Sequence, residues 1–451
     1  AVEFVPVPDW YYNVEYMEEQ KRGYEYKEDL YVPGYFEMPI KKGESVIFSA
    51  STSEVAANGL KRKFTSELKQ RISKDSLQHC LLNAAQQFIV RKEKSTEIKA
   101  GFPWFGTWGR DTFMALPGLT LTTGDLPTAL EVIDSMVVRM KNGLFPNTAI
   151  KGEPAFNSSD APLWFIRALQ QYEKYDPEFD IWKKYGKAIK EVLEAYRAGT
   201  SGIIRMLDNG LIYAEDVNYP LTWMDAVVDG QLVTPRPGLV VEVNALWYNA
   251  VCQALKWAEK RDRTFFKSWS HFPELIRQSF VDQFWNQEKG YLADFAHGEF
   301  KDFSVRPSQV IAVSVEYSPL DPEMKKSILD VVQGELLTPR GLRSLSPKNE
   351  AYKGIYEGNQ EKRDRAYHQG TVWPWLLEHY AEGVLVVHKN AGLGQVRKIF
   401  DEFEDVMSQR GIGSISEIYD GNPPHVARGS ISQATGVAAL LRINEMIEGF
   451  N

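Results

Sequence analysis

The sequence predicts a mainly α-helical protein, an (α/α)6 barrel of six helical hairpins, which follows a short remnant of a β-domain. Three observations favour this fold class. Apolar residues recur with helical spacing in roughly twelve segments between Phe64 and Ile447. These segments show no fixed sequence period, which argues against a repeat solenoid. The first 60 residues, in contrast, are rich in aromatic residues and poorly periodic.

The N-terminal segment is the part expected to be β-structure. Residues 11–23 and 28–40 are aromatic and irregular, and residues 44–51 predict a strand. One strand cannot bury itself, so this segment must pack on something else. We therefore interpret residues 1–60 as the end of an N-terminal β-domain and residues 61–451 as the helical domain.

The helices follow in order. The first is predicted over residues 64–91 and the second over 110–122. Asp125, with Pro127 in the first turn, opens the third, and Asp160 with Pro162 opens the fourth. The remaining predicted helices span 181–198, 242–260, 273–286, 307–316, 322–333, 371–388, 393–409 and 431–447. Short strand-like pieces at 210–213 and 290–295 lie between them.

Composition narrows the class of partner. A formal net charge of −8 gives no basis for a nucleic-acid surface, but it suits a neutral, polyhydroxylated ligand. No run of about 18 apolar residues is present, so we expect no membrane partner. The N-terminus is not a signal peptide, and we expect a cytoplasmic protein whose oligomeric state is left open. Cys80 and Cys252 are expected to be buried thiols, and the scattered histidines predict neither a metal nor another cofactor.

Five segments combine tryptophan or tyrosine with carboxylate or amide side chains. They span residues 101–112, 221–226, 242–249, 367–375 and 415–420. Aromatic faces stack on the C–H face of a pyranose, and ionised and amide groups bind its hydroxyls. Two distant carboxylates can also form the acid–base pair of a glycosidase. In a closed barrel, the loops at one end would bring these segments into a single pocket.

Two carboxylates stand out as a catalytic pair. Asp225 follows Trp223, and partial desolvation beside the ring favours the protonated form that a general acid needs. Glu215 and Asp216 are rivals, without an adjacent ring. Glu417 lies in an apolar, strand-like piece, where a charged group needs a purpose or a partner, which suggests a base that activates water. The simpler alternatives are a turn residue for Asp225 and a solvent-facing strand residue for Glu417.

Other residues are candidates for sugar binding. Arg110 and Asp111 could clamp adjacent hydroxyls, although a surface salt bridge with an N-cap explains the pair equally simply. Arg428 is expected to orient Glu417. The remaining candidates, for which capping and core packing are the alternatives, are Trp104, Phe105, Trp108, Asn157, Asp160, Trp164, Glu242, Asn244, Trp247, Tyr367, His368, Gln369 and Trp373.

At these motifs the chain resembles the glucosidase part of glycogen debranching enzymes, the amylo-α-1,6-glucosidase type. The resemblance covers about residues 65–451, and residues 1–60 resemble the end of the family's N-terminal β-domain. The motifs occur in the family's order as Trp-Gly-Arg-Asp-Thr, Thr-Trp-Met-Asp-Ala, Glu-Val-Asn-Ala-Leu-Trp-Tyr-Asn, Tyr-His-Gln-Gly-Thr-Val-Trp-Pro-Trp and Ser-Glu-Ile-Tyr-Asp-Gly.

The resemblance implies an (α/α)6 barrel that hydrolyses α-1,6-linked glucose branches of glycogen-like glucans with inversion. It makes Asp225 the general acid and Glu417 the general base. Arg110 and Asp111 would hold the terminal glucose, in a pocket lined by Trp104, Trp108 and Trp373. Trp223 is a further candidate for sugar binding. Thr107 and the stretch 427–432 depart from the family's pattern, which bears on substrate preference.

Two other functions remain open at this point. One is a different exo-acting (α/α)6 glycosidase of the glucoamylase, trehalase or mannosylglycerate-hydrolase kind. The other is a glucan-binding module without catalysis, which would need only the aromatic residues.

Overall fold

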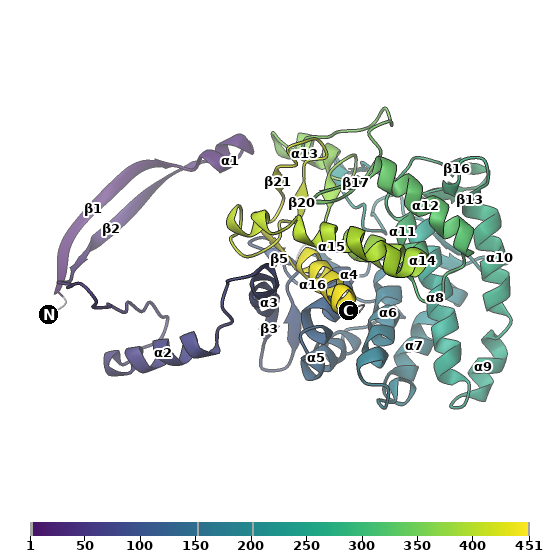
Figure 1. Ribbon diagram of the computed structural model, residues 1–451, viewed down its shortest axis with the longest axis horizontal. Helices are drawn as coiled ribbons and strands as arrows, with labels where there is room; N and C mark the ends of the chain where they lie inside the picture. Colours follow the sequence, from purple (N-terminus) through teal and green to yellow (C-terminus); the bar gives the residue numbers. More distant parts are fainter. Residues whose placement is uncertain (1–2, 151–152, 201–202, 450–451) are drawn as a thin grey trace. The chain divides into compact units, whose positions relative to one another are not determined.

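The computed structural model describes residues 3–150, 153–200 and 203–449. The protein is mostly helical and begins with a β-hairpin, so the mainly α class predicted from the sequence is confirmed (Figure 1). The chain forms two compact units, residues 1–73 with 357–363 and residues 74–356 with 364–451. Among the described residues, no helix is long and apolar enough to cross a membrane.

The first unit is built on one antiparallel hairpin. β1 (Glu3–Glu15) pairs with β2 (Lys27–Glu37), and the short helix α1 (Met17–Lys21) follows β1. The helix α2 (Leu60–Gln70) completes the segment. The strand predicted at 44–51 is wrong, because these residues have no regular structure. Gly43 turns the chain with a φ of +87°, and the aromatic runs before it form the ladder instead.

The second unit contains the long amphipathic helices. They are α3 (Leu77–Phe88), α4 (Gly109–Leu116), α5 (Leu126–Val137), α6 (Ala161–Tyr175), α7 (Ile181–Ala198), α8 (Val241–Ala258), α9 (Arg263–Trp269), α10 (Phe272–Phe284), α11 (Gln309–Ser314), α12 (Pro322–Glu335), α14 (Leu376–His388), α15 (Leu393–Asp401) and α16 (Ala434–Gly449). The helix α13 (Gln360–Ala366) crosses between the two units in sequence.

The predicted helix 64–91 is two helices and a strand. The chain is extended at Arg71, where α2 ends, and Ser76 caps α3 by accepting a hydrogen bond from the His79 backbone N–H (3.2 Å). Residues 89–91 then leave the helix as β3 (Ile89–Arg91), which pairs with β4 (Thr96–Ile98). A local cap thus overrides a continuous apolar period.

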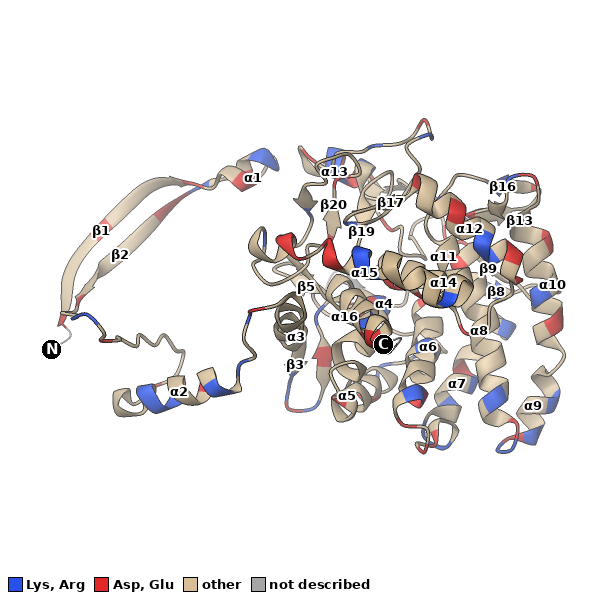
Figure 2. Ribbon diagram, viewed as in Figure 1, with Lys and Arg blue, Asp and Glu red and all other residues tan. Residues whose placement is uncertain are grey.

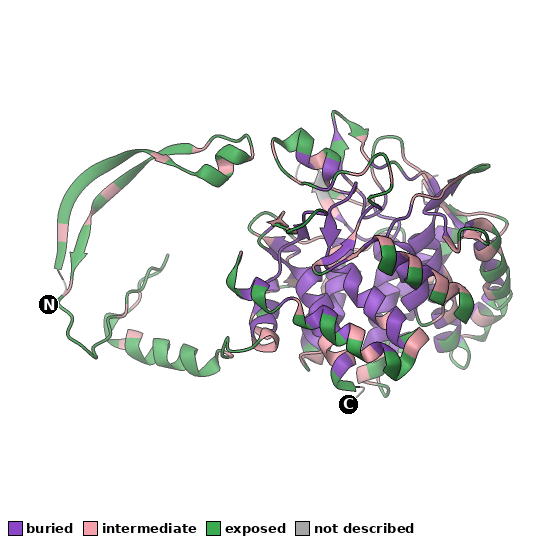
Figure 3. Cartoon of the chain, turned by 45° about the horizontal axis from the view of Figure 1, so that its top comes forward, coloured by how far each residue is buried: buried purple, intermediate pink, exposed green. Residues whose placement is uncertain are grey.

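Six helices form the buried centre of the second unit. α4 packs against α6, α6 against α8, α8 against α11, α11 against α14, α14 against α16, and α16 against α4. Figure 3 shows these central helices as mainly buried, with exposed residues on the helices around them. In the view of Figure 2, acidic and basic residues are interspersed along the outer helices α7, α9, α10 and α12.

Short strands tie together the loops between helices. Across one antiparallel sheet the strands follow the order β16 (Phe300–Asp302), β15 (Phe295–His297), β12 (Gly238–Val240), β9 (Ile212–Ala214) and β8 (Ile204–Met206). Across the other sheet the order is β17 (Leu337–Thr338), β18 (Gly341–Arg343), β19 (Val372–Trp373), β20 (Ile418–Tyr419) and β21 (Ala427–Arg428). β5 (Gly101–Phe102) pairs with β22 (Ser432–Gln433), so segments from the two ends of this unit become neighbours.

Candidate active site

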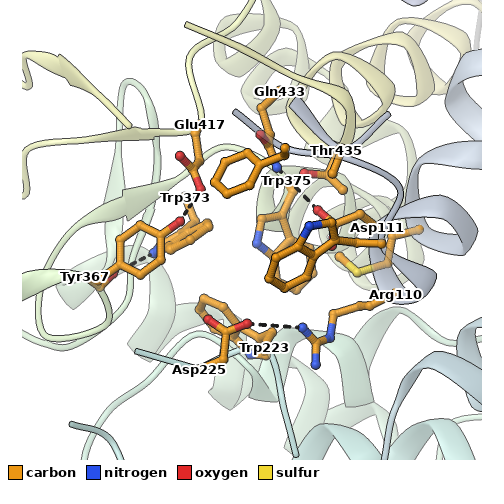
Figure 4. A pocket seen from close by; sticks show the side chains of 14 residues that line it. Arg110, Asp111, Trp223, Asp225, Tyr367, Trp373, Trp375, Glu417, Gln433 and Thr435 are labelled. Atoms are coloured by element: carbon orange, nitrogen blue, oxygen red, sulfur yellow. Dashed lines mark hydrogen bonds and ion pairs between the residues drawn. The ribbon is translucent and has the colours of Figure 1, made fainter. Parts of the chain in front are cut away.

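One pocket in the second unit is lined by residues from four of the five aromatic and acidic segments (Figure 4). These residues lie in and before α4, in the loop after β9, before α14, immediately before β20, and at β22 and the start of α16. The lining residues are Ala100, Phe105, Trp108, Arg110, Asp111, Met114, Trp223, Asp225, Tyr367, Trp373, Trp375, Glu417, Gln433 and Thr435.

Glu417 is held on one side of the pocket, immediately before β20. Its carboxylate accepts hydrogen bonds from the Tyr367 hydroxyl and from the backbone N–H of Ser430 (2.8 Å). Gly429 adopts a φ of +64°, and a Cβ there would lie 2.3 Å from Glu417 Oε2, so only glycine fits. Burial raises the pKa of Glu417 to about 7, although both hydrogen bonds act in the opposite direction.

Asp225 faces Glu417 from the opposite side of the pocket (Figure 4). Its side chain is 25% exposed, and Oδ2 lies 3.7 Å from Arg110 Nη1. The imidazole Nε2 of His368 lies 4.0 Å from Oδ1. Burial raises the pKa of Asp225 to about 7, while Arg110 lowers it and Asp111 raises it. Both carboxyl groups therefore titrate near neutral pH, as an acid–base pair requires.

Arg110 and Asp111 lie in the first turn of α4, where Gly109 allows close approach to the chain at Pro146 (a Cβ would lie 2.6 Å from its carbonyl oxygen). Arg110 Nε donates to Asp160 Oδ2 (2.7 Å), which fixes the guanidinium from behind. Gln433 Nε2, in β22, donates to Asp111 Oδ1 (3.3 Å). Burial raises the pKa of Asp111 to about 6, against the attraction of Arg110.

Tryptophan rings form the walls. The ring of Trp223 meets those of Trp373 and Trp375 edge to face, with centroids 5.3 Å apart in both pairs. The indole N–H of Trp223 donates to Ser308 Oγ (3.0 Å), which fixes the ring next to Asp225. Such a wall offers flat apolar surface beside two carboxyl groups.

His368 and Gln369 do not line this pocket. The His368 ring is fully buried and stacks on Trp373 at 5.3 Å, and burial lowers its pKa well below the usual range. Gln369 Oε1 accepts a hydrogen bond from Arg306 (2.9 Å), and its Nε2 donates to Thr234 (3.1 Å). Both residues support the loops behind the pocket rather than presenting groups to a ligand.

The segment 242–249 lies at the start of α8, outside the pocket. Glu242 forms a buried ion pair with Arg236. Asn244 hydrogen-bonds the backbone of Ile212 through its Oδ1 (2.7 Å) and Nδ2 (3.0 Å), and the Trp247 indole donates to Gly210 (3.0 Å). The structure thus gives these predicted binding residues a role in holding β9 against α8.

Four other candidates also lie elsewhere. Trp164 is buried in the core, and Trp104 is 47% exposed outside the lining. Arg428 donates to Asp420 Oδ2 (2.8 and 3.0 Å) and not to Glu417. The pairing of β20 with β21 brings Arg428 close to the Asp420 side chain. Asn157 lines an adjoining cavity.

Several lining residues were missed by sequence reasoning. Trp375 lies within a motif that was singled out, and the polar residues Gln433 and Thr435 just before α16 are a signal that could have been used. Ala100 and Met114 carry no chemical signal in the sequence. Within the described residues, no group of three or more His, Cys, Asp or Glu side chains is placed to hold a metal ion. Cys80 and Cys252 are free thiols there; Cys80 is buried as predicted, whereas Cys252 is only partly buried.

Comparison with known proteins identifies the family. Residues 83–442 match the family described as "Amylo-alpha-1,6-glucosidase". The chain belongs to this family. Residues 1–47 match the "Glycogen debranching enzyme N terminal" family. The curated "Glycogen debranching enzyme" of Saccharomyces cerevisiae is 23% identical over 423 residues, which cover 69% of this chain and 27% of the yeast protein. The chain thus matches about a quarter of that relative's length.

Proposed function

We propose that this protein is an inverting, exo-acting glycoside hydrolase that removes α-1,6-linked glucose branches from glycogen-like glucans. The observation that supports this most directly is the pair Asp225 and Glu417, which face each other across a tryptophan-walled pocket. Membership of the amylo-alpha-1,6-glucosidase family supports the linkage and the substrate class.

The scaffold proposed for this chemistry is an (α/α)6 barrel. The contacts from α4 through α6, α8, α11, α14 and α16 return to α4, which supports an inner ring of six helices. The outer partners would be α3, α5, α7, α10, α12 and α15, each of which packs on an inner helix. The loops and helix starts at one end of such a ring would carry most of the pocket residues. We also propose that the catalytic domain extends over residues 61–451.

In the proposed reaction, Asp225 is protonated and donates its proton to the glycosidic oxygen as the bond from that oxygen to the anomeric carbon breaks. Glu417 is ionised and accepts a proton from the water that attacks the same carbon on the opposite face. The product is β-glucose, together with a new hydroxyl on the leaving chain. This geometry needs about 6.5–9.5 Å between the two carboxyl groups, which leaves room for the water.

Arg110 and Asp111 are proposed to hold the glucose being released. A guanidinium donates and a carboxylate accepts, so adjacent hydroxyls of one ring can be bound by the pair. Phe105, Trp108, Trp223 and Trp373 supply apolar faces around them. Gln433 would fix the Asp111 carboxylate through the hydrogen bond between them.

Glucose release from phosphorylase limit dextrin tests this function. Asp225→Asn and Glu417→Gln should each lower kcat by about 10²–10⁴-fold, because each removes one proton transfer. Asp208→Asn and Glu288→Gln are matched controls at exposed positions away from the pocket and should keep wild-type activity. A folded wild-type protein that binds dextrin but releases no glucose would contradict the proposal. Preferential cleavage of maltosyl substrates, trehalose or mannosylglycerate would contradict the substrate assignment.

A further inference from the structure

A second cavity adjoins the catalytic pocket and shares Asp225, Arg110 and Trp108 with it. Glu417 lines only the first. The second cavity is lined by residues at the start of α4, around the first residue of β6 (Thr148–Ile150), after β7 (Glu153–Ala155) and in the loop that leads to Asp225. Its lining residues are Trp108, Arg110, Asn147, Thr148, Asn157, Tyr219, Pro220, Thr222 and Asp225.

Because Asp225 lines both cavities and Glu417 only one, the two cavities can be assigned to different sides of the bond that is cleaved. A general acid must reach the oxygen that joins two sugars, so it stands at the boundary between the sugar released and the sugar left behind. The base stands with the attacking water on the other face of the released sugar. Asp225 occupies the boundary position and Glu417 is on the far side. We propose that the second cavity binds the sugar on the leaving-group side of the scissile bond, an inference that rests on the proposed function.

Polar groups in this cavity suit a neutral sugar. The Oδ1 atom of Asn157 is buried, and none of the described residues donates a hydrogen bond to it. Such an acceptor is costly unless a ligand or water supplies a donor, and a sugar hydroxyl is one. Asn147 also lines the cavity, and its Oδ1 already accepts a hydrogen bond from the Arg110 backbone N–H (3.2 Å). Thr148 and Thr222 supply further hydroxyl-bearing side chains.

The aromatic group of the cavity is Tyr219. Its side chain remains 45% exposed, on a loop that turns at Asp216, whose Oδ1 accepts the backbone N–H groups of Asn218 (2.8 Å) and Tyr219 (3.2 Å). One cavity thus contains a partly exposed aromatic ring and an amide oxygen without a donor among the described residues, which is the combination expected for a pyranose. The charged lining groups, Arg110 and Asp225, already face each other at 3.7 Å, so the cavity does not call for a charged ligand.

The test compares two substrates that differ only in the leaving group. A branched dextrin with one α-1,6-linked glucose fills both cavities, whereas α-D-glucosyl fluoride has no second sugar. Asn157→Ala and Tyr219→Leu should lower the ratio of kcat/KM for dextrin to kcat/KM for the fluoride by about tenfold each, the value of one hydrogen bond or one stacking contact. Val217→Ala is the matched control, because Val217 lies in the same loop, is 80% exposed and does not line the cavity.

The outcomes separate this inference from the proposed function. A ratio that falls in both variants and not in the control supports the leaving-group site. A wild-type enzyme that cleaves both substrates, with variants whose ratio is unchanged or whose two rates fall equally, overturns the inference and leaves the proposed function standing. A wild-type enzyme that cleaves neither substrate overturns both. Activity on the fluoride also shows that each variant is folded.

Discussion

Burial raises the pKa of both Asp225 and Glu417 to about 7, but the two carboxyl groups have different neighbours. Burial favours the protonated form of both. Glu417 accepts two hydrogen bonds, from Tyr367 and Ser430, which stabilise its charged form. The Asp225 carboxyl group lies 3.7 Å from the Arg110 guanidinium and 4.0 Å from the His368 imidazole, and the nearby charge of Asp111 raises its pKa. The proposed mechanism places the charge on Glu417, which these two hydrogen bonds stabilise, and the proton on Asp225.

Replacing Tyr367 with Phe tests this assignment through pH. The hydroxyl donates to the Glu417 carboxylate and so lowers its pKa, which means that its loss should raise the pKa above about 7. The base must be ionised, so activity on the acid side should be lost at a higher pH than in the wild type. A profile of kcat/KM from about pH 5 to 9 should show the acid limb moved upward, with the alkaline limb, which reports Asp225, nearly in place.

Tyr291→Phe is the control for that profile. Its hydroxyl donates to the Phe303 carbonyl (2.9 Å) away from the pocket, so the profile should not move. If the acid limb of Tyr367→Phe coincides with that of the wild type, Glu417 is not the group that titrates there.

Individual site residues were predictable only where a reactive side chain stood in an unusual local sequence. Asp225 beside Trp223, and Glu417 within an apolar stretch, carried a signal in the local sequence. Whether a Trp or Asn on a helix points into the pocket or into the core depends on helix packing, which explains why Asn244 and Trp247 are buried away from the pocket. Trp104 lies in an exposed turn after β5. Arg428 was assigned to the wrong carboxylate because strand pairing, unlike sequence distance, decides its neighbour.

At the scale of elements, one buried cluster joins the loop before Asp225 to β12, α8 and β15. Arg236 donates to Glu242 (2.5 and 2.7 Å) and to Asp294 (2.6 and 2.8 Å), and all three side chains are buried. Its Nη1 also lies 3.5 Å from Thr222 Oγ1, in the loop that carries Asp225. The cluster therefore links β12, α8 and β15 to the loop that positions Asp225.

Removing the Arg236 guanidinium should destabilise the fold, because the buried carboxylates around it lose their cation. Arg236→Met leaves two buried carboxylates without their partner, and we expect the free energy of unfolding to fall by about 3–5 kcal/mol. Arg261→Met breaks an exposed ion pair with Asp180 (2.8 Å) and should cost far less. Urea unfolding followed by circular dichroism measures both. Equal decreases in the free energy of unfolding in the two variants would show that the buried cluster contributes no more stability than an exposed ion pair.

Close helix packing gives a second prediction at this scale. Gly118 lies in η2 (Pro117–Leu121), a π-helical turn that continues α4, and a Cβ there would lie 2.2 Å from the Ala438 carbonyl oxygen of α16. Gly118→Ala should destabilise the protein by about 1–3 kcal/mol, because the backbones must move apart. Gly334→Ala in α12 meets nothing within 4 Å and should stabilise it slightly. Thermal unfolding of the two variants should shift in opposite directions, and a parallel shift would contradict the packing argument.

Elements were predictable to the extent that their pattern was local. Helices such as α7 and α12 follow apolar periodicity with an Asp cap, and both were found from the sequence. Strands of two or three residues, such as β19 and β20, exist because distant loops pair, so they leave no periodic signal. The wrong strand at 44–51 shows the converse, since an apolar run without a partner does not form a ladder.

For the whole molecule, the site depends on dispersed loops that meet. Asp111, Asp225 and Glu417 lie hundreds of positions apart at the extremes, yet each contributes to one pocket. Their union could be expected only from the count of helices and from resemblance to a family, since no local pattern specifies which loops converge. The relations that position the pocket, β5 with β22 and β19 with β20, are tertiary pairings.

The stereochemistry of the released glucose tests the central claim most directly. Proton NMR should follow the anomeric signals during the first minutes of limit-dextrin cleavage, before mutarotation brings the two anomers to equilibrium. An acid at Asp225 and a base at Glu417 acting through water predict that β-glucose is released first and that the α-anomer grows in later. If α-glucose is released first, the reaction proceeds with retention, and the roles given to the two carboxyl groups are wrong.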